Sequence, residues 1–409
     1  MKKAILDFFL RYIDENSSKI ISFREQLHMN PELSCCEKST RDYILSNVAE
    51  KKFVRVHKFK DTYGFWVDVI FDETSDMVVV AIRADIDALP IREETGLSFA
   101  SKNEGVMHAC GHDAHTAIVL GALCAVINNY DILKKSIKIS TLRFIFQAAE
   151  EKAPGGALTL IEKGVMKNAV MVFGMHVMPH IESGRFGIRD GGIMAGGDRL
   201  NVTLSGRGGH AAKPDEACDL ILLAGEIITS AQRIISRDIS PLDSAVLSFC
   251  EINAGTASNI MPSTLTFSGT LRSLEPAVLK KVRDGIEKII KLRCEEFGAS
   301  VEIVWTKGYP PMVNAPQAVQ KYLAAARRVL GEKNVIYPDR PIMGGDDFAR
   351  YAEISPGAFA FLGVGGGGVG GGGVEEETYP LHHPKFNVGG ADILNGTKVM
   401  AALICEFAG

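Results

Sequence analysis

Hydrophobic residues follow two different patterns along the chain. In the first 190 or so residues, short apolar runs rich in β-branched residues alternate with stretches of helical spacing. That alternation is typical of an α/β domain with a mostly parallel sheet. It predicts buried strands over 77–84, 142–148 and 169–177, and a helix over 115–128.

The pattern changes after the glycine-rich stretch 191–197. We predict strand, helix, strand, strand, helix, strand, over 199–205, 219–236, 245–252, 264–271, 275–297 and 300–305. This β-α-β-β-α-β order is that of a ferredoxin-like unit. Chains of this length usually split into domains. We therefore expect an α/β domain in two parts, residues 1–192 and 307–409, with a ferredoxin-like α+β domain inserted at 193–306.

Two other segments are interpreted from their composition. Residues 1–25 have apolar positions at helical spacing interrupted by Asp7, Arg11 and Asp14, which predicts one amphipathic surface helix rather than a signal peptide. Residues 363–373 contain nine glycines, and no helical pattern follows them directly. We expect a flexible loop there, not a dinucleotide-binding turn.

Charge and cysteine content narrow the class of protein. The 45 basic and 49 acidic residues give a net charge of −4, and no dense basic patch suggests nucleic-acid binding. No segment is long and apolar enough to predict a membrane span. The eight cysteines form no C-x-x-C pair, which favours free thiols in a reducing compartment, hence a cytoplasmic protein.

The strongest chemical signal is the segment 108–115, with sequence HACGHDAH. Cys110 and His112 are two residues apart, so an extended or loop backbone would direct both side chains to one side. A thiolate and an imidazole suit Zn²⁺, Mn²⁺, Co²⁺ or Ni²⁺. The alternatives are polar residues at a helix N-terminus, or Cys110 as a papain-like nucleophile, which so many metal-binding neighbours disfavour.

A second signal is the adjacent pair Glu150 and Glu151, which follows a predicted buried strand. Alone, the pair would indicate a solvated helix start. Beside a metal cluster, one carboxylate can bind metal while its neighbour acts as a base toward a metal-activated water. No G-x-S-x-G, H-E-x-x-H or Walker motif competes with this interpretation.

Distant histidines are candidates to complete such a site. His176 ends a predicted strand, where a histidine is more often a satisfied core residue. His382 and His383 precede a proline just before the last predicted helix, and one of them can close a metal shell.

Seven motifs together resemble the aminoacylase/carboxypeptidase-G-type metallopeptidases. The resemblance is to their amidohydrolase branch, which includes hippurate hydrolases and indole-acetyl-amino-acid hydrolases. It covers nearly the whole chain, and the segment HACGHDAHT is its most specific part. The motifs are NPELS at 30–34, RADIDALP at 83–90, HACGHDAHT at 108–116, GRGGHAA at 206–212, NIMP at 259–262, GTLR at 269–272 and LHHP at 381–384.

The resemblance implies a zinc-peptidase-like catalytic domain with an inserted dimerisation, or lid, domain, and hence a homodimer. It also implies two divalent transition metal ions bridged by Cys110. His112 and His176 would complete one metal site, and Glu151 and His382 the other.

Further roles are implied residue by residue. Glu150 would be the general base, and Asp85 would orient a ligand histidine. His210 would polarise the scissile carbonyl or bind the substrate carboxylate, and it reaches the partner subunit's site in such a dimer. Asn259 and Arg272 would help to hold that carboxylate.

Three positions depart from the family pattern. Ala148 stands where proline is usual, and Asp215 where a histidine is common after Pro214. In the segment 344–348 (GGDDF), Asp346 replaces the usual glutamate.

The sequence therefore predicts a metal-dependent amidohydrolase that cleaves N-acetyl, N-benzoyl or similar N-acyl amino acids. One alternative is a dipeptidase or an N-acetyl-diaminopimelate-type deacetylase. Another is a non-catalytic metal-binding protein on the same scaffold, which the presence of both Glu150 and Glu151 disfavours.

Overall fold

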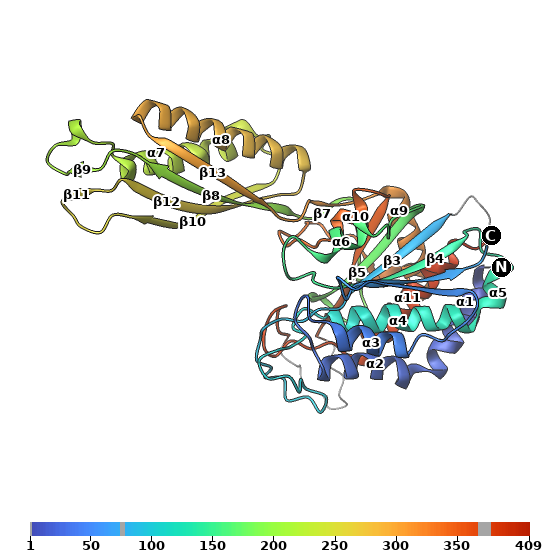
Figure 1. Ribbon diagram of the computed structural model, residues 1–409. Coiled ribbons are helices and arrows are strands. Elements are labelled where there is room, and N and C mark those ends of the chain that lie inside the picture. The colour runs from blue at the N-terminus through green and yellow to red at the C-terminus, as the bar shows by residue number, and fades with distance from the viewer. Residues whose placement is uncertain (1, 74–77, 367–377) are drawn as a thin grey trace. The chain divides into compact units, whose positions relative to one another are not determined.

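The computed structural model describes residues 2–73, 78–366 and 378–409, which form two compact units (Figure 1). The first unit comprises Met1–Gly191, Val313–Arg340 and Asp347–Gly409. The second comprises Gly192–Met312 and Pro341–Asp346. The first unit is thus discontinuous in sequence, and most of the second is one uninterrupted stretch.

An eight-stranded sheet forms the centre of the first unit. Its strands are β1 (Val54–Lys58), β2 (Phe65–Ile70), β3 (Val79–Asp85), β4 (Thr141–Gln147), β5 (Ala169–Glu182), β6 (Phe186–Gly187), β15 (Val335–Ile336) and β16 (Gly357–Gly365). They lie in the order β1-β2-β4-β3-β5-β16-β6-β15. The four inner strands β4, β3, β5 and β16 are parallel, and β1 and β2 add antiparallel strands at one edge. The α/β prediction is confirmed.

Helices cover this sheet. They are α1 (Lys2–Glu15), α2 (Ser17–Met29), α3 (Lys38–Ser46), α4 (His112–Asn128), α5 (Tyr130–Lys134), α6 (Gly156–Glu162), α9 (Pro316–Leu330), α10 (Ala349–Ala352) and α11 (Gly390–Cys405). Helix α4 is buried along almost its whole length because it packs against β3, α2 and α11 (Figure 1). A helix that is apolar on all faces is typical of such an enclosed position.

The start of α4 corrects an assumption made from the sequence. The helix begins at His112, three residues before the predicted start, and Gly111 precedes it in a left-handed conformation with φ of 91°. The metal motif therefore lies at a loop-to-helix junction rather than in extended chain. The predicted N-terminal amphipathic helix is present as α1, but it ends at Glu15, and a second helix, α2, begins at Ser17. Asparagine and serine are weak helix formers at this point.

The described start of the glycine-rich segment differs from the predicted loop. Its first residues, Gly363 to Gly365, belong to strand β16. A Cβ atom on Gly365 would lie 1.9 Å from the carbonyl oxygen of Pro179, so only glycine allows β5 and β16 to approach this closely. The rest of the segment, from residue 367, lies outside the described residues.

The second unit has the predicted order β-α-β-β-α-β. Its main elements are β8 (Gly196–Ser205), α7 (Leu220–Arg233), β10 (Ala245–Ala254), β12 (Thr264–Ser273), α8 (Pro276–Phe297) and β13 (Ser300–Lys307). The strands form an antiparallel sheet in the order β10-β12-β8-β13. The two helices pack together over it and enclose a separate hydrophobic core.

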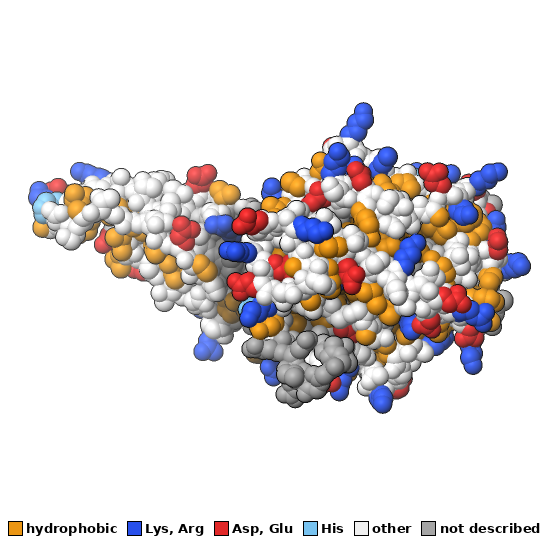
Figure 2. Space-filling model, turned by 90° about the horizontal axis from the view of Figure 1, so that it is seen from below, with side chains coloured by type: hydrophobic (Ala, Val, Ile, Leu, Met, Phe, Trp, Pro, Cys, Tyr) orange, Lys and Arg blue, Asp and Glu red, His pale blue; other side chains and the backbone are white. Residues whose placement is uncertain are grey.

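Smaller elements complete the chain. Strands β9 (Gly209–His210) and β11 (Ile260–Met261) pair in the second unit. Strands β7 (Gly191–Met194) and β14 (Met312–Asn314) pair where the chain passes from one unit to the other. Among the described residues, no helix combines the length and apolarity that crossing a bilayer requires. Acidic and basic side chains are interspersed over the face of the molecule drawn in Figure 2.

Candidate metal centre

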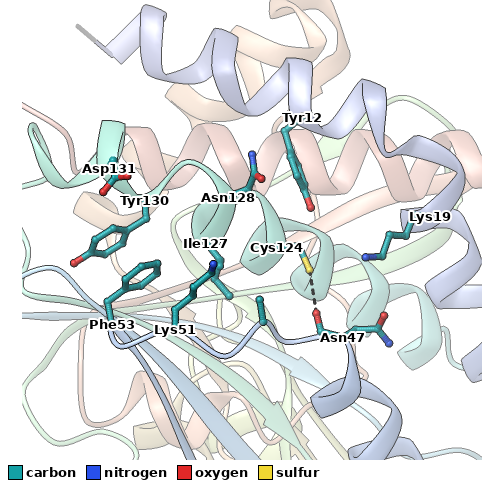
Figure 3. A pocket seen from close by; sticks show the side chains of 11 residues that line it. Tyr12, Lys19, Asn47, Lys51, Phe53, Cys124, Ile127, Asn128, Tyr130 and Asp131 are labelled. Atoms are coloured by element: carbon teal, nitrogen blue, oxygen red, sulfur yellow. Dashed lines mark hydrogen bonds between the residues drawn. The ribbon is translucent and has the colours of Figure 1, made fainter.

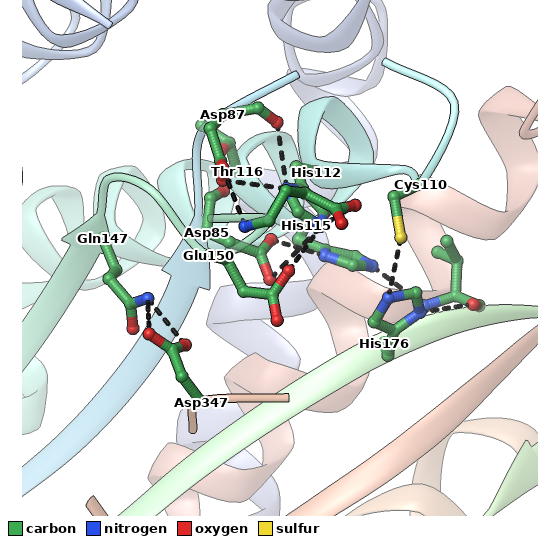
Figure 4. Close-up of polar contacts among 12 residues, drawn as sticks. Asp85, Asp87, Cys110, His112, His115, Thr116, Gln147, Glu150, His176 and Asp347 are labelled. Carbon is green, nitrogen blue, oxygen red and sulfur yellow. Dashed lines mark hydrogen bonds and ion pairs between the residues drawn. The ribbon is translucent and has the colours of Figure 1, made fainter. Parts of the chain in front are cut away.

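The candidate centre lies where three parallel strands end. Because β3, β4 and β5 run in the same direction, their carboxyl ends meet at one edge of the sheet, a common place for active sites. Asp85 ends β3, the pair Glu150 and Glu151 follows β4, and His176 lies within β5. The start of α4 brings His112 to the same place (Figure 4).

One group of candidate ligands consists of Cys110, His112 and His176, whose ligand atoms lie within 4.8 Å of one another and are buried. Both histidines contact a backbone carbonyl through Nδ1, at 2.9 Å to Asp87 for His112 and 2.7 Å to Val177 for His176. Each Nδ1 must therefore carry the proton, since a carbonyl only accepts. The Nε2 atoms keep free lone pairs, and that of His176 lies 3.4 Å from Cys110 Sγ.

A second group shares the same cysteine and consists of Cys110, Glu151 and His382. His382 Nε2 lies 3.3 Å from Glu151 Oε1. The histidine has φ of 64°, and its N–H donates to the carbonyl of Ala109 at 2.8 Å, so its backbone is fixed beside the motif. The neighbouring His383 instead stacks on Tyr379.

Two buried atoms in these groups have no hydrogen-bond partner among the described residues. They are His112 Nε2 and Glu151 Oε1. Buried polar atoms are rarely left unpaired unless a water or an ion completes them. A thiol, two imidazoles oriented through Nδ1 and a carboxylate therefore fit a transition-metal cation, and a cation would satisfy both atoms.

The pKa values in the cluster depend strongly on burial. Burial raises the pKa of the Cys110 thiol well above its usual value and lowers that of His176 well below its usual value. Burial also disfavours protonated His112, but the negative charge of Asp85 and the hydrogen bond to Asp87 outweigh it and raise the pKa of His112 well above its usual value. A bound cation favours the thiolate and the neutral imidazoles, because ligands must be deprotonated.

Glu150 is buried beside the ligands, with Oε2 3.9 Å from His112 Nε2. Ala149 before it has φ of 54°, a conformation unusual for alanine, which turns the backbone between the strand and the two carboxylates. The Ala149 N–H donates to Glu37 Oε1 at 2.8 Å. Glu37, whose pKa burial raises to about 7, was not identified from the sequence.

Asp85 contacts a second histidine of the same motif besides His112. It accepts a hydrogen bond from His115 Nδ1 at 2.7 Å, and His115 in turn accepts the N–H of Val177. Two carboxylates contact the candidate ligand His112: Asp87 Oδ1 lies 3.2 Å from Nδ1, and Asp85 Oδ2 lies 3.7 Å from Nε2. Sequence reasoning missed Asp87, although it lies two residues beyond Asp85 and therefore faces the same way in extended chain.

The substrate-binding candidates lie in the second unit. His210 on β9 pairs with Ile260 on β11, and Asn259 accepts the Ala211 N–H through its carbonyl at 3.1 Å. His210 and Asn259 line one hollow of about 630 Å³. Arg272 does not line this hollow. Thr264, at the start of β12, does line it, and Arg272 lies eight residues further along the same strand, or about 26 Å at 3.3 Å per residue.

The remaining cysteines are also free thiols, and none of the eight forms a disulfide. Cys124 lies in a separate hollow of about 430 Å³ beside α4, near Tyr12, Phe53 and Tyr130 (Figure 3). Burial raises its pKa to about 11. Among the residues that the structure describes, Cys124 belongs to no group of three candidate ligands, so Cys110 is distinguished by its neighbours rather than by burial.

Known proteins resemble this chain over most of its length. An N-acetyl-L-cysteine deacetylase of Bacillus subtilis is 36% identical over 379 residues, which cover 93% of this chain and 86% of the relative. An N-acyl-L-amino acid amidohydrolase of Geobacillus stearothermophilus is 38% identical over 304 residues, which cover 74% of this chain and 80% of the relative.

A solved structure shows the same fold. A Bacillus subtilis protein described as a dinuclear metal-binding peptidase of family M20 has a TM-score of 0.78 and 31% identity, covering 96% of this chain and 98% of its own. The fold and the clustered side chains are those of a hydrolase of the metallopeptidase type. Residues 81–406 match the peptidase family M20/M25/M40, and the chain belongs to that family. The resemblance inferred from the sequence is confirmed.

Proposed function

We propose that this protein hydrolyses the amide bond of N-acyl amino acids with the help of two divalent transition metal ions. The observation that carries the proposal is that Cys110 belongs to two adjacent ligand groups, with Glu150 buried beside both. The activities of the two relatives support this substrate class, and the dinuclear metal binding of the solved Bacillus subtilis peptidase supports two metals.

Cys110, His112 and His176 would hold one cation, and Cys110, Glu151 and His382 the other. When bound, such cations polarise a carbonyl and lower the pKa of water to roughly 7. Glu150 takes the proton of the attacking water and returns it to the departing amine. This role requires a carboxylate that lies next to the metal ligands but does not itself bind a metal. Asp85 orients β5 through His115, and Asp87 orients His112.

We assign His210 and Asn259 to the substrate's carbonyl and carboxylate, because both line one hollow and both are exposed. Arg272 is assigned to the carboxylate on the family resemblance alone, because it does not line that hollow. In an acyl-transfer step, donors aimed at the developing oxyanion lower the barrier.

We further propose a cytoplasmic homodimer that forms through residues 193–306, the inserted domain. Strand β10 lies at an edge of its sheet and exposes the apolar residues Val246 and Ile252, at 45% and 52% of their surface. Exposed apolar edge strands are typical sites of pairing between chains. The eight free cysteines suit a reducing compartment.

A substrate panel tests the proposal. The protein is stripped of metal with a chelator, reconstituted with Mn²⁺ or Zn²⁺, and assayed on N-acetyl, N-benzoyl and indole-acetyl amino acids and on dipeptides. We expect hydrolysis of N-acyl amino acids that vanishes with chelator and returns with metal. Turnover of dipeptides alone would indicate a dipeptidase, and no turnover in any reconstituted sample would contradict the enzymatic proposal.

A further inference from the structure

Backbone N–H groups hold the segment that carries Glu150 and Glu151, the loop between β4 and α6. Three of them donate to buried carboxylates that come from distant parts of the chain. The pairs are Ala149 with Glu37 at 2.8 Å, Glu151 with Asp87 at 3.0 Å and Ala157 with Asp347 at 2.9 Å. The loop therefore depends on side chains far away in sequence for its conformation.

Asp347 is the carboxylate that contacts both ends of this loop. At the start of the loop, Gln147 Nε2 donates to both carboxylate oxygens, at 2.7 and 2.8 Å (Figure 4). At its end, the Ala157 N–H donates to Oδ2. Between them the chain passes directly over the carboxylate, since a Cβ atom on Gly155 would lie 2.2 Å from Asp347 Oδ2.

The same carboxylate is tied to the end of β3. Arg83 Nη2 donates to Asp347 Oδ1 at 2.8 Å, and Arg83 Nη1 donates to Asp85 Oδ2 at 2.6 Å. Asp85 in turn holds His115. Asp347, Arg83 and Gln147 are all fully or almost fully buried, so water does not compete for these contacts.

We propose that Asp347 is a positioning residue that fixes Glu150 and Glu151 for the reaction. It closes the loop at both ends and joins it to the strand that carries Asp85. The inference rests on the proposed function for the roles of the two glutamates, but the mechanical role of Asp347 can be tested without activity. Outer contacts of this kind commonly change metal affinity or activity 10- to 100-fold when lost.

The test substitutes Asp347→Asn. In asparagine, an N–H₂ donor replaces one of the two carboxylate oxygens. Each of these oxygens accepts two hydrogen bonds, so donors would then face donors. The substitution also removes one of the two negative charges that Arg83 contacts. Hydrogen–deuterium exchange of the metal-free protein is followed in peptides that cover residues 148–157. We expect exchange there to rise about 10-fold or more above that of the parent protein.

Asp68→Asn is the matched control. Asp68 is also a buried aspartate of the central sheet, and it accepts two bonds from Arg143, at 2.8 and 2.9 Å, away from the loop. A comparable loss of stability is expected from it without faster exchange in 148–157. If this segment exchanges no faster in Asp347→Asn than in Asp68→Asn, the proposal is wrong.

A milder variant keeps the test decisive if Asp347→Asn does not fold. Tyr351→Phe removes only the hydroxyl that donates to Gln147 Oε1 at 3.0 Å, and so loosens the residue that Asp347 holds. A smaller, several-fold rise in exchange over the same segment is expected. An unchanged rate in a folded Tyr351→Phe protein then contradicts the proposal.

Kinetics separate positioning from general stability. With metal restored, we expect Asp347→Asn to lower kcat about 10- to 100-fold with KM unchanged, because a displaced base slows the chemical step more than binding. Asp68→Asn is expected to leave both constants near those of the parent protein. If Glu150→Gln proves fully active, the proposed function fails, whereas the exchange result for Asp347 still stands by itself.

Discussion

The candidate metal centre of the first unit and the hollow of the second are built in opposite ways. In the metal centre, most candidate side chains are buried, although His382 is exposed, and His112 is oriented by the backbone carbonyl of Asp87. In the hollow, His210 is exposed, and its ring accepts one local hydrogen bond from the Ala212 N–H. A preorganised site carries bond-breaking chemistry. An exposed side chain with few contacts, such as His210, is suited to a residue that is positioned only when the substrate binds.

The largest effect that tests this contrast is expected at Glu150. Glu150→Gln keeps the shape of the side chain but removes the proton acceptor, so kcat should fall about 10²- to 10⁴-fold. Bound metal, measured by elemental analysis, should be unchanged. Glu162→Gln on the exposed face of α6 serves as control. Parental turnover in a metal-loaded Glu150→Gln protein would remove Glu150 from the mechanism.

His210 tests the other side of the contrast. His210→Ala should lower kcat/KM about 10²- to 10³-fold if the ring meets the oxyanion. Because the residue is exposed, the free energy of unfolding should change by less than about 0.5 kcal/mol. Metal content should also stay constant. Lys213→Ala, at an exposed position nearby, is the control. If the two variants were equally active, His210 would have no role in the reaction.

Asp87 sharpens the comparison within the metal centre. Asp87→Asn alters the contacts to His112 and to the Glu151 N–H, so Mn²⁺ affinity should fall about 10- to 100-fold. Equilibrium dialysis against Mn²⁺ measures the change, with Asp68→Asn as the control for lost stability. Unaltered affinity would show that the backbone carbonyl at residue 87 orients His112 without the carboxylate.

The smallest effect concerns Glu37 and pH. Its Oε1 accepts two backbone N–H groups, while Oε2 is buried without a partner among the described residues, which favours the protonated acid. Since its folded pKa of about 7 exceeds the ordinary value of 4.5, folding binds a proton, and stability decreases as pH rises from about 4.5 to 7.

Glu37→Gln mimics the protonated acid and should abolish this part of the pH dependence. Urea unfolding of the metal-free protein at pH 5 and pH 8 should show a difference between the two proteins on the order of 1–3 kcal/mol. Parallel pH profiles for the parent and the variant would show that Glu37 is ionised in the folded protein throughout.

The sequence predicted elements whose signal is local. The strands 79–85 and 141–147 are mostly apolar and buried along their whole length, and the alternation of strands and helices in the second unit predicted its element order. The metal motif was equally predictable from the sequence, because its cysteine and histidines lie within a few residues of one another.

The groups that hold the loop at 148–157 were not predictable in this way. Glu37, Asp87 and Asp347 each accept an N–H from this segment, and their approach depends on the register of β3 and β4, in which Asp85 lies opposite Gln147. Register depends on the whole sheet, and an isolated acidic residue carries no sign of its distant partner. The hydrogen bond between Asp85 and His115 was missed for the same reason.

The discontinuity of the first unit has a consequence for the nascent chain. Ribosomal synthesis delivers Cys110, His112, Glu151 and His176 well before His382, and β16 becomes available to pair with β5 only after the second unit has been made. The second unit is almost uninterrupted and has its own core, so it can fold while the first still lacks an inner strand. A metal ion that arrived early would meet only part of the proposed ligand set, and the proposed centre would be complete only when the C-terminal segment with His382 docks.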